Sequence, residues 1–393
     1  MNKQELEEEK ILNIARIISK TIKKKALYYD ENPQFQEQNF TLLIKKKYLT
    51  LAIPKSLGGL NISMPTIILA QLELAKGDAS TALGIGMHTI VCGYESENFL
   101  WSKKQRESIF TSIVQNGLLI NNIASEAELG SPKNGGLPTT EISIDSLNKL
   151  RLNGKKNWAT LSTGLTFMVV YAINKETNRL CRVLIRTNSP GISINKNWNG
   201  LGMRSTESHE VIFKNVLIKK TDILYEHGKS KKYEKIPINA WFPLIIAATS
   251  MGIAIEARNK LIVFLQNRRP SGYEKSISEI PFIKYQLGEI ESRIMIAKSF
   301  LINITQSWED KKIPRKEIYP YIVAAKREAT ETAVFVTDKV MRLVGGIALE
   351  KNHEFERLFR DARSGLINPP IESRALETIA DFSLINNKKD FRL

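Results

Sequence analysis

Near its C-terminus the chain reads Arg360-Asp361-Ala362-Arg363-Ser364-Gly365-Leu366-Ile367-Asn368-Pro369-Pro370. The Arg-Asp pair lies in the charged tail of a helix, and this helix leads into a loop that two prolines stiffen. On both sides of the stretch, apolar residues recur at helical spacing. They predict four long helices, at residues 241–266, 281–309, 318–344 and 371–386, with Pro- or Gly-containing breaks between them. Four such helices favour an antiparallel bundle.

Upstream of this bundle the pattern of the chain changes twice. Residues 2–118 show helical periodicity, as in Ile11, Ile14, Ile18 and Ile22, whereas residues 119–225 contain short β-prone runs between turn clusters. We therefore predict an α+β protein with three domains. These are an N-terminal α-helical domain at 1–118, a small β-barrel at 119–226 and, after a charged linker at 227–235, a helical bundle at 235–393.

The composition limits the possible partners and compartments. The 393 residues are 42% hydrophobic and 25% charged, which is typical of a globular protein. The net charge is +16, but the lysines form short scattered runs without interleaved aromatic residues, so we expect no nucleic-acid partner. The polar N-terminus lacks a secretory signal, and the most apolar stretch, 241–255, is shorter than the ~20 residues of a membrane span. Cys92 and Cys181 lack metal-site spacing, so we expect a cytoplasmic protein with no metal and no membrane contact.

Three motifs in the predicted β domain suit a flat, electron-rich ligand. Residues 124–132 (Ala-Ser-Glu-Ala-Glu-Leu-Gly-Ser-Pro) let backbone N–H groups approach a ligand closely. Residues 152–160 (Leu-Asn-Gly-Lys-Lys-Asn-Trp-Ala-Thr) place Trp158 and Thr160 on one face of a strand. Residues 198–209 form a loop rich in glycine and hydrogen-bond donors. Taken singly, each motif also fits a polar turn, a core tryptophan or an ordinary loop.

Together and in this order, the three motifs resemble the middle domain of the acyl-CoA dehydrogenase family. That family carries a Thr-Glu-Pro-x-x-Gly-Ser segment, a Lys-x-Trp-Ile-Thr strand and a Leu-Gly-x-Arg-x-Ser/Thr loop. Further matches lie at residues 53–59, 344–346 and 360–362, so the resemblance extends over most of the chain. It implies a helical domain, a β-barrel and a four-helix bundle, assembled as a homotetramer or homodimer, with FAD between barrel and bundle.

Carried over by motif, the resemblance implies a cofactor site of Ser125, Ser131, Trp158, Thr160, Arg269 (or its neighbour Arg268), Arg342, Gly345 and Gly346. Ser125, Trp158 and Thr160 would line the flavin ring, and the arginine after the first bundle helix would clamp the FAD of a neighbouring subunit. Arg342 replaces a glutamine of the family and could pair with a pyrophosphate. The same change leaves FMN or reduced flavin open as alternatives to tightly held FAD.

The resemblance is weakest at the catalytic base. The family's dehydrogenases need a carboxylate to remove an α-proton, and its usual position is Pro369 here; the position that other members use is Phe242. Glu372 is then the candidate base, although a glutamate near a helix start also has a structural explanation. His88 is a second candidate catalytic residue, because histidine titrates near neutral pH and can hydrogen-bond a flavin. The alternative for His88 is a packing role, and His209 is a weaker candidate.

Two reactions follow from the resemblance. The first is oxidation of an acyl thioester, bound to CoA or a carrier protein, at its α and β carbons with hydride transfer to flavin. The alternative is a reduced-flavin-dependent monooxygenase of the same fold, acting on a sulfur, amine or amino-sugar substrate, which needs no α-proton base. An electron-transfer partner would serve the first reaction and a flavin reductase the second. A third interpretation, a non-enzymatic scaffold, is disfavoured because the Trp158–Thr160 strand is present.

Overall fold

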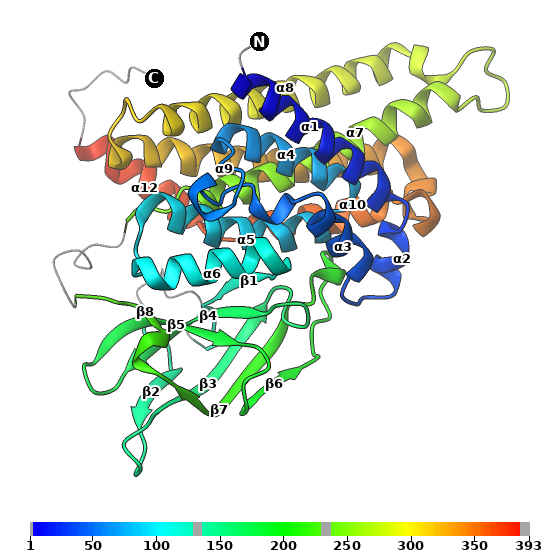
Figure 1. The fold of residues 1–393 in the computed structure, drawn as a ribbon. Helices are drawn as coiled ribbons and strands as arrows, with labels where there is room; N and C mark the ends of the chain where they lie inside the picture. Colours follow the sequence, from blue (N-terminus) through cyan, green and yellow to red (C-terminus); the bar gives the residue numbers. More distant parts are fainter. Residues whose placement is uncertain (1–2, 129–135, 229–236, 386–393) are drawn as a thin grey trace.

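The computed structural model describes residues 3–128, 136–228 and 237–385 and has a helical, β and helical region in chain order (Figure 1). The N-terminal helices are α1 (Lys3–Lys23), α2 (Ala26–Glu31), α3 (Glu37–Lys45), α4 (Met64–Gly77), α5 (Ala79–Asn98) and α6 (Lys103–Asn116). Local sequence sets their ends. Asp78 caps α5 by accepting from the Thr81 amide, and Ser102 and Gln105 form a capping box on α6. Gly117 ends α6 in the left-handed conformation, with φ of 64°.

In the described part of the middle region the strands form one eight-stranded sheet, in which seven follow the order β6-β7-β3-β2-β4-β5-β8 and β1 pairs with β4. Its strands are β1 (Ile120–Ile123), β2 (Glu141–Ile144), β3 (Leu150–Ala159), β4 (Phe167–Asn174), β5 (Arg179–Arg186), β6 (Ile192–Asn195), β7 (His209–Ile218) and β8 (Ile223–Glu226). β1 and β2 both run parallel to β4 and pair with successive parts of it. β1 pairs with β4 from Phe167 onward, and β2 pairs with β4 from Ile173 onward. In Figure 1 the sheet lies below the helices, and α5 contacts β1.

The C-terminal region contains α7 (Trp241–Asn267), α8 (Pro281–Asp310), α9 (Arg315–Val344), α10 (Phe355–Ala362), α11 (Ser364–Ile367) and α12 (Glu372–Ile385). The four long helices lie where the periodicity predicts them, and the fold class is confirmed. The end of the last predicted helix and most of the predicted linker lie outside the described residues. α7 is central because it is apolar on nearly every side and packs on α9, α4 and α5.

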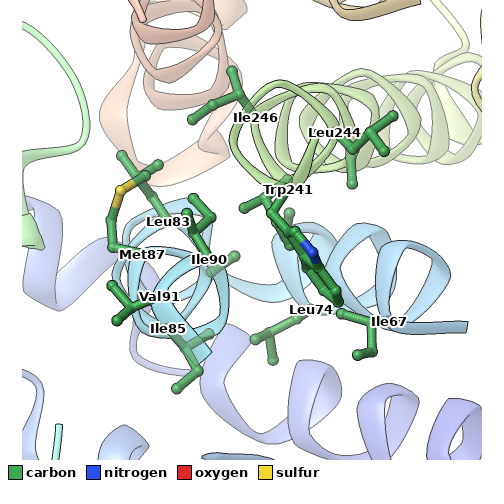
Figure 2. Close-up of a cluster of buried hydrophobic side chains, with 14 of the residues drawn as sticks. Ile67, Leu74, Leu83, Ile85, Met87, Ile90, Val91, Trp241, Leu244 and Ile246 are labelled. Carbon is green, nitrogen blue, oxygen red and sulfur yellow. The ribbon is translucent and has the colours of Figure 1, made fainter. Parts of the chain in front are cut away.

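A single apolar core joins the two helical regions. Figure 2 shows side chains of α4, α5 and α7 facing one another, with the Trp241 indole reaching from α7 towards Ile67 and Leu74 of α4. Gly93 of α5 is needed at this contact, because a Cβ there would lie 2.5 Å from the Trp241 ring. The N-terminal domain and the bundle are therefore packed as one body.

Buried charged side chains on α10 connect all three regions. Arg357 pairs with Asp361 at 3.4 Å and lies 4.0 Å from Asp78, the residue that caps α5. Asp361 also accepts a hydrogen bond of 2.6 Å from the Met203 amide of the β domain. Gly202 permits this close approach, since a Cβ on it would lie 2.6 Å from the backbone of Arg360. The α10 helix thus sets the position of the β domain against the bundle.

Within the described ranges, no helix is both long and apolar enough to cross a membrane. The same residues contain no group of three or more His, Cys, Asp or Glu side chains placed to hold a metal ion.

Candidate active site

Trp158 presents a half-exposed indole near the end of β3. Its φ of 55° is left-handed, and it lies at an irregularity in the β3–β7 register between Lys156 and Ala159. A bulky residue rarely adopts this conformation, which costs about 1–3 kcal/mol and persists where the surrounding structure enforces it. The irregular turn leaves 54% of Trp158 exposed. The strand therefore offers a flat aromatic surface to a ligand.

Ser125 lies beside this strand because Asn157 connects the two segments. The Asn157 amide donates to the Ser125 carbonyl at 2.9 Å, and Asn157 Oδ1 accepts from the Ala127 amide at 2.9 Å. The structure thus brings three predicted site residues together, Ser125, Trp158 and Thr160. Trp158 lies in β3, Thr160 lies in the turn that follows this strand, and Ser125 lies in the segment that follows β1.

A buried ion pair anchors the same segment. Lys156 Nζ lies 2.6 Å from Glu126 Oε1, and both side chains are buried. The Glu126 carboxylate also accepts from the amides and hydroxyls of Thr139 and Thr140. Burial favours the neutral acid, but Lys156 and the threonine donors outweigh it and lower the pKa of Glu126 to about 2. Glu126 is therefore ionised at neutral pH and holds the Ser125 segment against β3.

Three hydroxyl groups run inward from the exposed end of this site. Thr160 Oγ1 lies 3.1 Å from Ser208 Oγ, and Ser208 Oγ lies 2.8 Å from Thr206 Oγ1. Thr206 Oγ1 in turn donates to the Met203 carbonyl at 2.9 Å. Ser208 and Thr206 are buried, whereas Thr160 is partly exposed. We call these three residues the hydroxyl chain.

The loop between α11 and α12 contains the two prolines, and Lys326 of α9 hydrogen-bonds to backbone carbonyls of α11 and of the loop itself. Lys326 Nζ donates to the Gly365 carbonyl at 2.8 Å and to the Pro370 carbonyl at 3.1 Å. Burial lowers the pKa of Lys326 to about 8. The Pro369-Pro370 peptide bond is cis. Neither Pro369 nor Phe242, the two positions at which the resemblance implies a catalytic base, offers a side-chain group that can accept a proton.

Glu372 begins α12 directly after this loop. Its Oε1 accepts from Arg327 Nη2 at 2.7 Å and from Arg327 Nε at 3.1 Å, and its side chain is 56% exposed. Arg327 follows Lys326 on α9, so Glu372 and the proline loop are fixed to the same part of that helix. The carboxylate is near the loop in sequence and in space, with both arginine contacts on one oxygen.

His88 is surrounded by backbone groups. Its Nε2 lies 2.9 Å from the Leu49 carbonyl, and its Nδ1 accepts from the Ile120 amide at 3.3 Å. This pattern requires the neutral ring with its proton on Nε2. Burial lowers the pKa of His88 to about 4, so the ring is uncharged at neutral pH. Both nitrogens are thus engaged in joining α5 to β1 and to the segment before α4.

His209, the weaker candidate, is also buried. Its Nδ1 accepts from the Trp198 amide at 3.0 Å, and its Nε2 lies 3.2 Å from Glu207 Oε2. As the partner of Ala159 in the sheet register it lies on the inner face of the sheet, whereas Trp158 is turned outward.

The residues expected to clamp the nucleotide part of FAD lie elsewhere. Arg268 and Arg269 are exposed after α7, and Arg268 lines a pocket of about 600 Å³ with Lys23, Lys260 and His353. Figure 1 places the end of α7 on the side of the bundle away from the sheet.

The other expected clamp residues are also exposed. Arg342 pairs with Asp338 at 2.8 Å, and Gly345 and Gly346 follow it at the end of α9. In the part of the chain that the structure describes, neither these three residues nor the two arginines after α7 have a hydrogen bond or ion pair to Ser125, Trp158 or Thr160. Ser131 lies outside the described residues.

Family models match all three regions in chain order. The acyl-CoA dehydrogenase N-terminal domain matches residues 5–116, the middle domain 123–216 and the C-terminal domain 244–367. The chain belongs to the acyl-CoA dehydrogenase family. Such an enzyme is a flavin-dependent oxidoreductase.

Relatives and solved structures agree with this membership. YdbM of Bacillus subtilis, whose acyl-CoA dehydrogenase name is provisional, is 33% identical over 89% of this chain and 90% of its own. Butyryl-CoA dehydrogenase of Megasphaera elsdenii has the same fold, with a TM-score of 0.85 at 19% identity over 98% and 99% of the two chains. So does FMN-bound TdsC of Paenibacillus sp. A11-2, a dibenzothiophene monooxygenase, with a TM-score of 0.85 at 21% identity over 97% and 98%. Both structures show the fold alone.

The geometry around Trp158 fits a flavin ring. The exposed indole gives a flat surface, the Thr160 amide donates to the Trp158 carbonyl at 3.0 Å, and the Ser125 backbone is bound to the neighbouring Asn157. The sequence motifs indicate Ser125, Trp158 and Thr160. They do not indicate the interactions that hold the surrounding segments in place, namely the Glu126–Lys156 ion pair, the hydrogen bonds of the inner hydroxyl chain and those of Lys326. The available signal for the ion pair was a charged residue at an inward position of β3.

We expect Glu126→Gln to destabilise the protein by about 3 kcal/mol, because it leaves Lys156 buried without its counter-ion. Flavin affinity should fall as well, since the Ser125 segment loses its anchor. The matched control is Glu128→Gln, whose partner Lys155 lies 3.9 Å away with both side chains exposed. Urea unfolding and flavin titration measure both effects. Equal unfolding midpoints for the two variants would contradict an anchoring role.

We also expect His88 to make folding pH-dependent. Its pKa is about 4 in the folded protein and 6.5 in the unfolded chain. The unfolded chain therefore binds the proton more readily, and stability is lost as pH falls from about 6.5 to about 4, by roughly 3 kcal/mol in total. The slope of unfolding free energy with pH in this window should be smaller in His88→Gln than in the wild type. His353→Gln, at an exposed histidine, is the control and should keep the wild-type slope.

Proposed function

We propose that this enzyme oxidises an acyl thioester, bound to CoA or a carrier protein, at its α and β carbons. The observation that carries the proposal is the Trp158–Thr160 segment at the end of β3 with Ser125 beside it, in a chain of this family. A bound flavin supplies the hydride acceptor for such a reaction. Trp158 would cover the ring, while Ser125 and Thr160 would hydrogen-bond its polar edge.

Glu372 is the proposed general base. It follows the loop that holds the base in the family's dehydrogenases, and Arg327 fixes it there through a single carboxylate oxygen. The second oxygen, Oε2, would take the α-proton. Lys326 supports this geometry, because it holds the carbonyls of Gly365 and Pro370 and so fixes the loop before Glu372.

The proposed cofactor is FAD, with FMN or reduced flavin as the alternatives. FAD would need the exposed Arg269, Arg342, Gly345 and Gly346 to act across a subunit boundary, so a homotetramer or homodimer is part of the proposal. Large apolar side chains exposed on α8 and α12 support such an assembly: Phe282, Tyr285, Met295, Ile296, Leu376, Leu384 and Ile385. An electron-transfer protein would reoxidise the flavin.

A second candidate function is a reduced-flavin-dependent monooxygenase acting on a sulfur, amine or amino-sugar substrate. The specific observation in its favour is that both family base positions are apolar, Pro369 and Phe242. That reaction requires no α-proton base, and a flavin reductase would take the place of the electron-transfer protein.

One pair of assays separates the two functions. The purified protein is first tested for bound flavin, and is then mixed anaerobically with a panel of acyl-CoA thioesters. Bleaching of the flavin supports the dehydrogenase. Oxygenation of a substrate when reduced flavin and O2 are supplied supports the monooxygenase. Flavin that is neither bleached nor used for oxygenation would exclude both functions.

We expect Glu372→Gln to abolish thioester-driven flavin reduction, because the variant cannot accept the α-proton. The matched control is Glu377→Gln on the same helix, where the glutamate pairs with Arg374 on the surface; it should reduce flavin at the wild-type rate. Stopped-flow absorbance under anaerobic conditions measures both rates. Wild-type rates in Glu372→Gln would remove Glu372 from the mechanism.

A further inference from the structure

The hydroxyl chain ends on a group that can accept hydrogen bonds but cannot donate them. The Met203 carbonyl accepts from Thr206 Oγ1 at 2.9 Å, from the Thr206 amide at 3.2 Å and from Trp198 Nε1 at 3.2 Å. Three donors converge on this oxygen, and the Met203 amide is itself held by Asp361. The inner end of the chain is therefore fixed in position and in hydrogen-bonding character.

This fixed end sets the direction of every hydrogen bond in the chain. Each hydroxyl has one proton to donate. Thr206 gives its proton to Met203, so the contact of 2.8 Å between Thr206 and Ser208 must use the Ser208 proton. The contact of 3.1 Å between Ser208 and Thr160 must then use the Thr160 proton.

Thr160 is thus left with lone pairs alone for any further partner. The reverse direction would leave Thr206 Oγ1 facing the Met203 carbonyl at 2.9 Å without a proton between them. Such a contact between two buried acceptors is unfavourable, and the burial of Thr206 and Ser208 keeps out water that could relieve it.

A flavin changes its hydrogen-bonding character at N5 with its oxidation state. The oxidised ring has a lone pair at N5 and needs a donor, whereas the reduced ring carries N5–H and needs an acceptor. We propose that Thr160 faces N5 of the bound ring, and that Thr206 and Ser208 are positioning residues that make Thr160 an acceptor, so that the site binds reduced flavin more tightly than oxidised flavin. This inference rests on the proposed flavin site and specifies which form of the cofactor that site favours.

Preference for the reduced form makes the bound flavin a stronger acceptor of electrons. It therefore favours hydride removal from an acyl thioester, and it would equally help a monooxygenase to take up flavin that a reductase has already reduced. The preference belongs to the cofactor site itself and is the same for either substrate.

The test is Thr206→Val, which removes the inner hydroxyl while keeping the shape of the side chain. Ser208 is then free to donate to Thr160, and Thr160 to an oxidised ring. Dissociation constants are measured for oxidised FMN and FAD, and anaerobically for the dithionite-reduced forms. We expect the preference for reduced flavin to fall about tenfold, which for a two-electron couple lowers the midpoint potential by about 30 mV.

Three further variants make the result specific. Ser208→Ala breaks the chain at its middle and should shift the preference in the same direction, which also covers the case that Thr206→Val does not fold. Thr206→Ser keeps the hydroxyl and should restore the wild-type preference. Thr163→Val is the control, because the Thr163 hydroxyl donates to Glu207 at 2.9 Å outside the chain; it should leave the preference unchanged.

Two results would overturn the inference. One leaves the proposed flavin site intact, and the other excludes that site as well. If the wild type binds flavin but Thr206→Val and Ser208→Ala shift the preference no more than Thr163→Val does, the hydroxyl chain has no directing role and the proposed function stands. If the folded wild type binds neither form of FMN or FAD, the flavin site itself is wrong, and the inference falls with it.

Discussion

The contact between the Asp361 carboxylate and the Met203 amide, 2.6 Å long and buried, is the interaction on which the candidate site depends. Asp361 belongs to the bundle and is held by Arg357, which also approaches the cap of α5. Met203 belongs to the β domain, and its carbonyl is the end point of the hydroxyl chain. One buried ionic group therefore fixes the domain arrangement and orients polar groups that lead to Thr160. Such a group is costly to bury, so its partners have to be placed accurately.

Local patterns in the sequence were enough to predict the elements of the fold. The helix predicted at 281–309 is observed at Pro281–Asp310, because apolar periodicity and a proline at the start are local signals. The same kind of local signal names the candidate site residues. Trp158 and Thr160 are close in sequence, and their motif is continuous. Ser125 joins them through Asn157, which belongs to that motif.

Contacts between distant residues could not be predicted. Lys156 occupies an inward position of β3, but its partner Glu126 lies on another segment, so the pairing of the two could not be predicted. Glu372 could be proposed as a base, but nothing near it in the chain indicated that Arg327 binds it. The partners of His88 were equally unpredictable. Its neighbours in the sequence indicate only a helix rich in small residues, whereas its two ring nitrogens contact Leu49 and Ile120, which are distant in the chain. In each case the deciding partner is supplied by tertiary packing.

The exposure of Trp158 has a practical consequence. The protein contains five tryptophans, of which Trp101, Trp241 and Trp308 are buried. Trp158 is 54% exposed at the candidate site, so its indole is in contact with water while these three are shielded from it. We expect a ligand that covers this face to change the long-wavelength part of the emission, where a water-exposed indole contributes most. The enzyme thus carries a native optical reporter at the surface where its cofactor is proposed to bind.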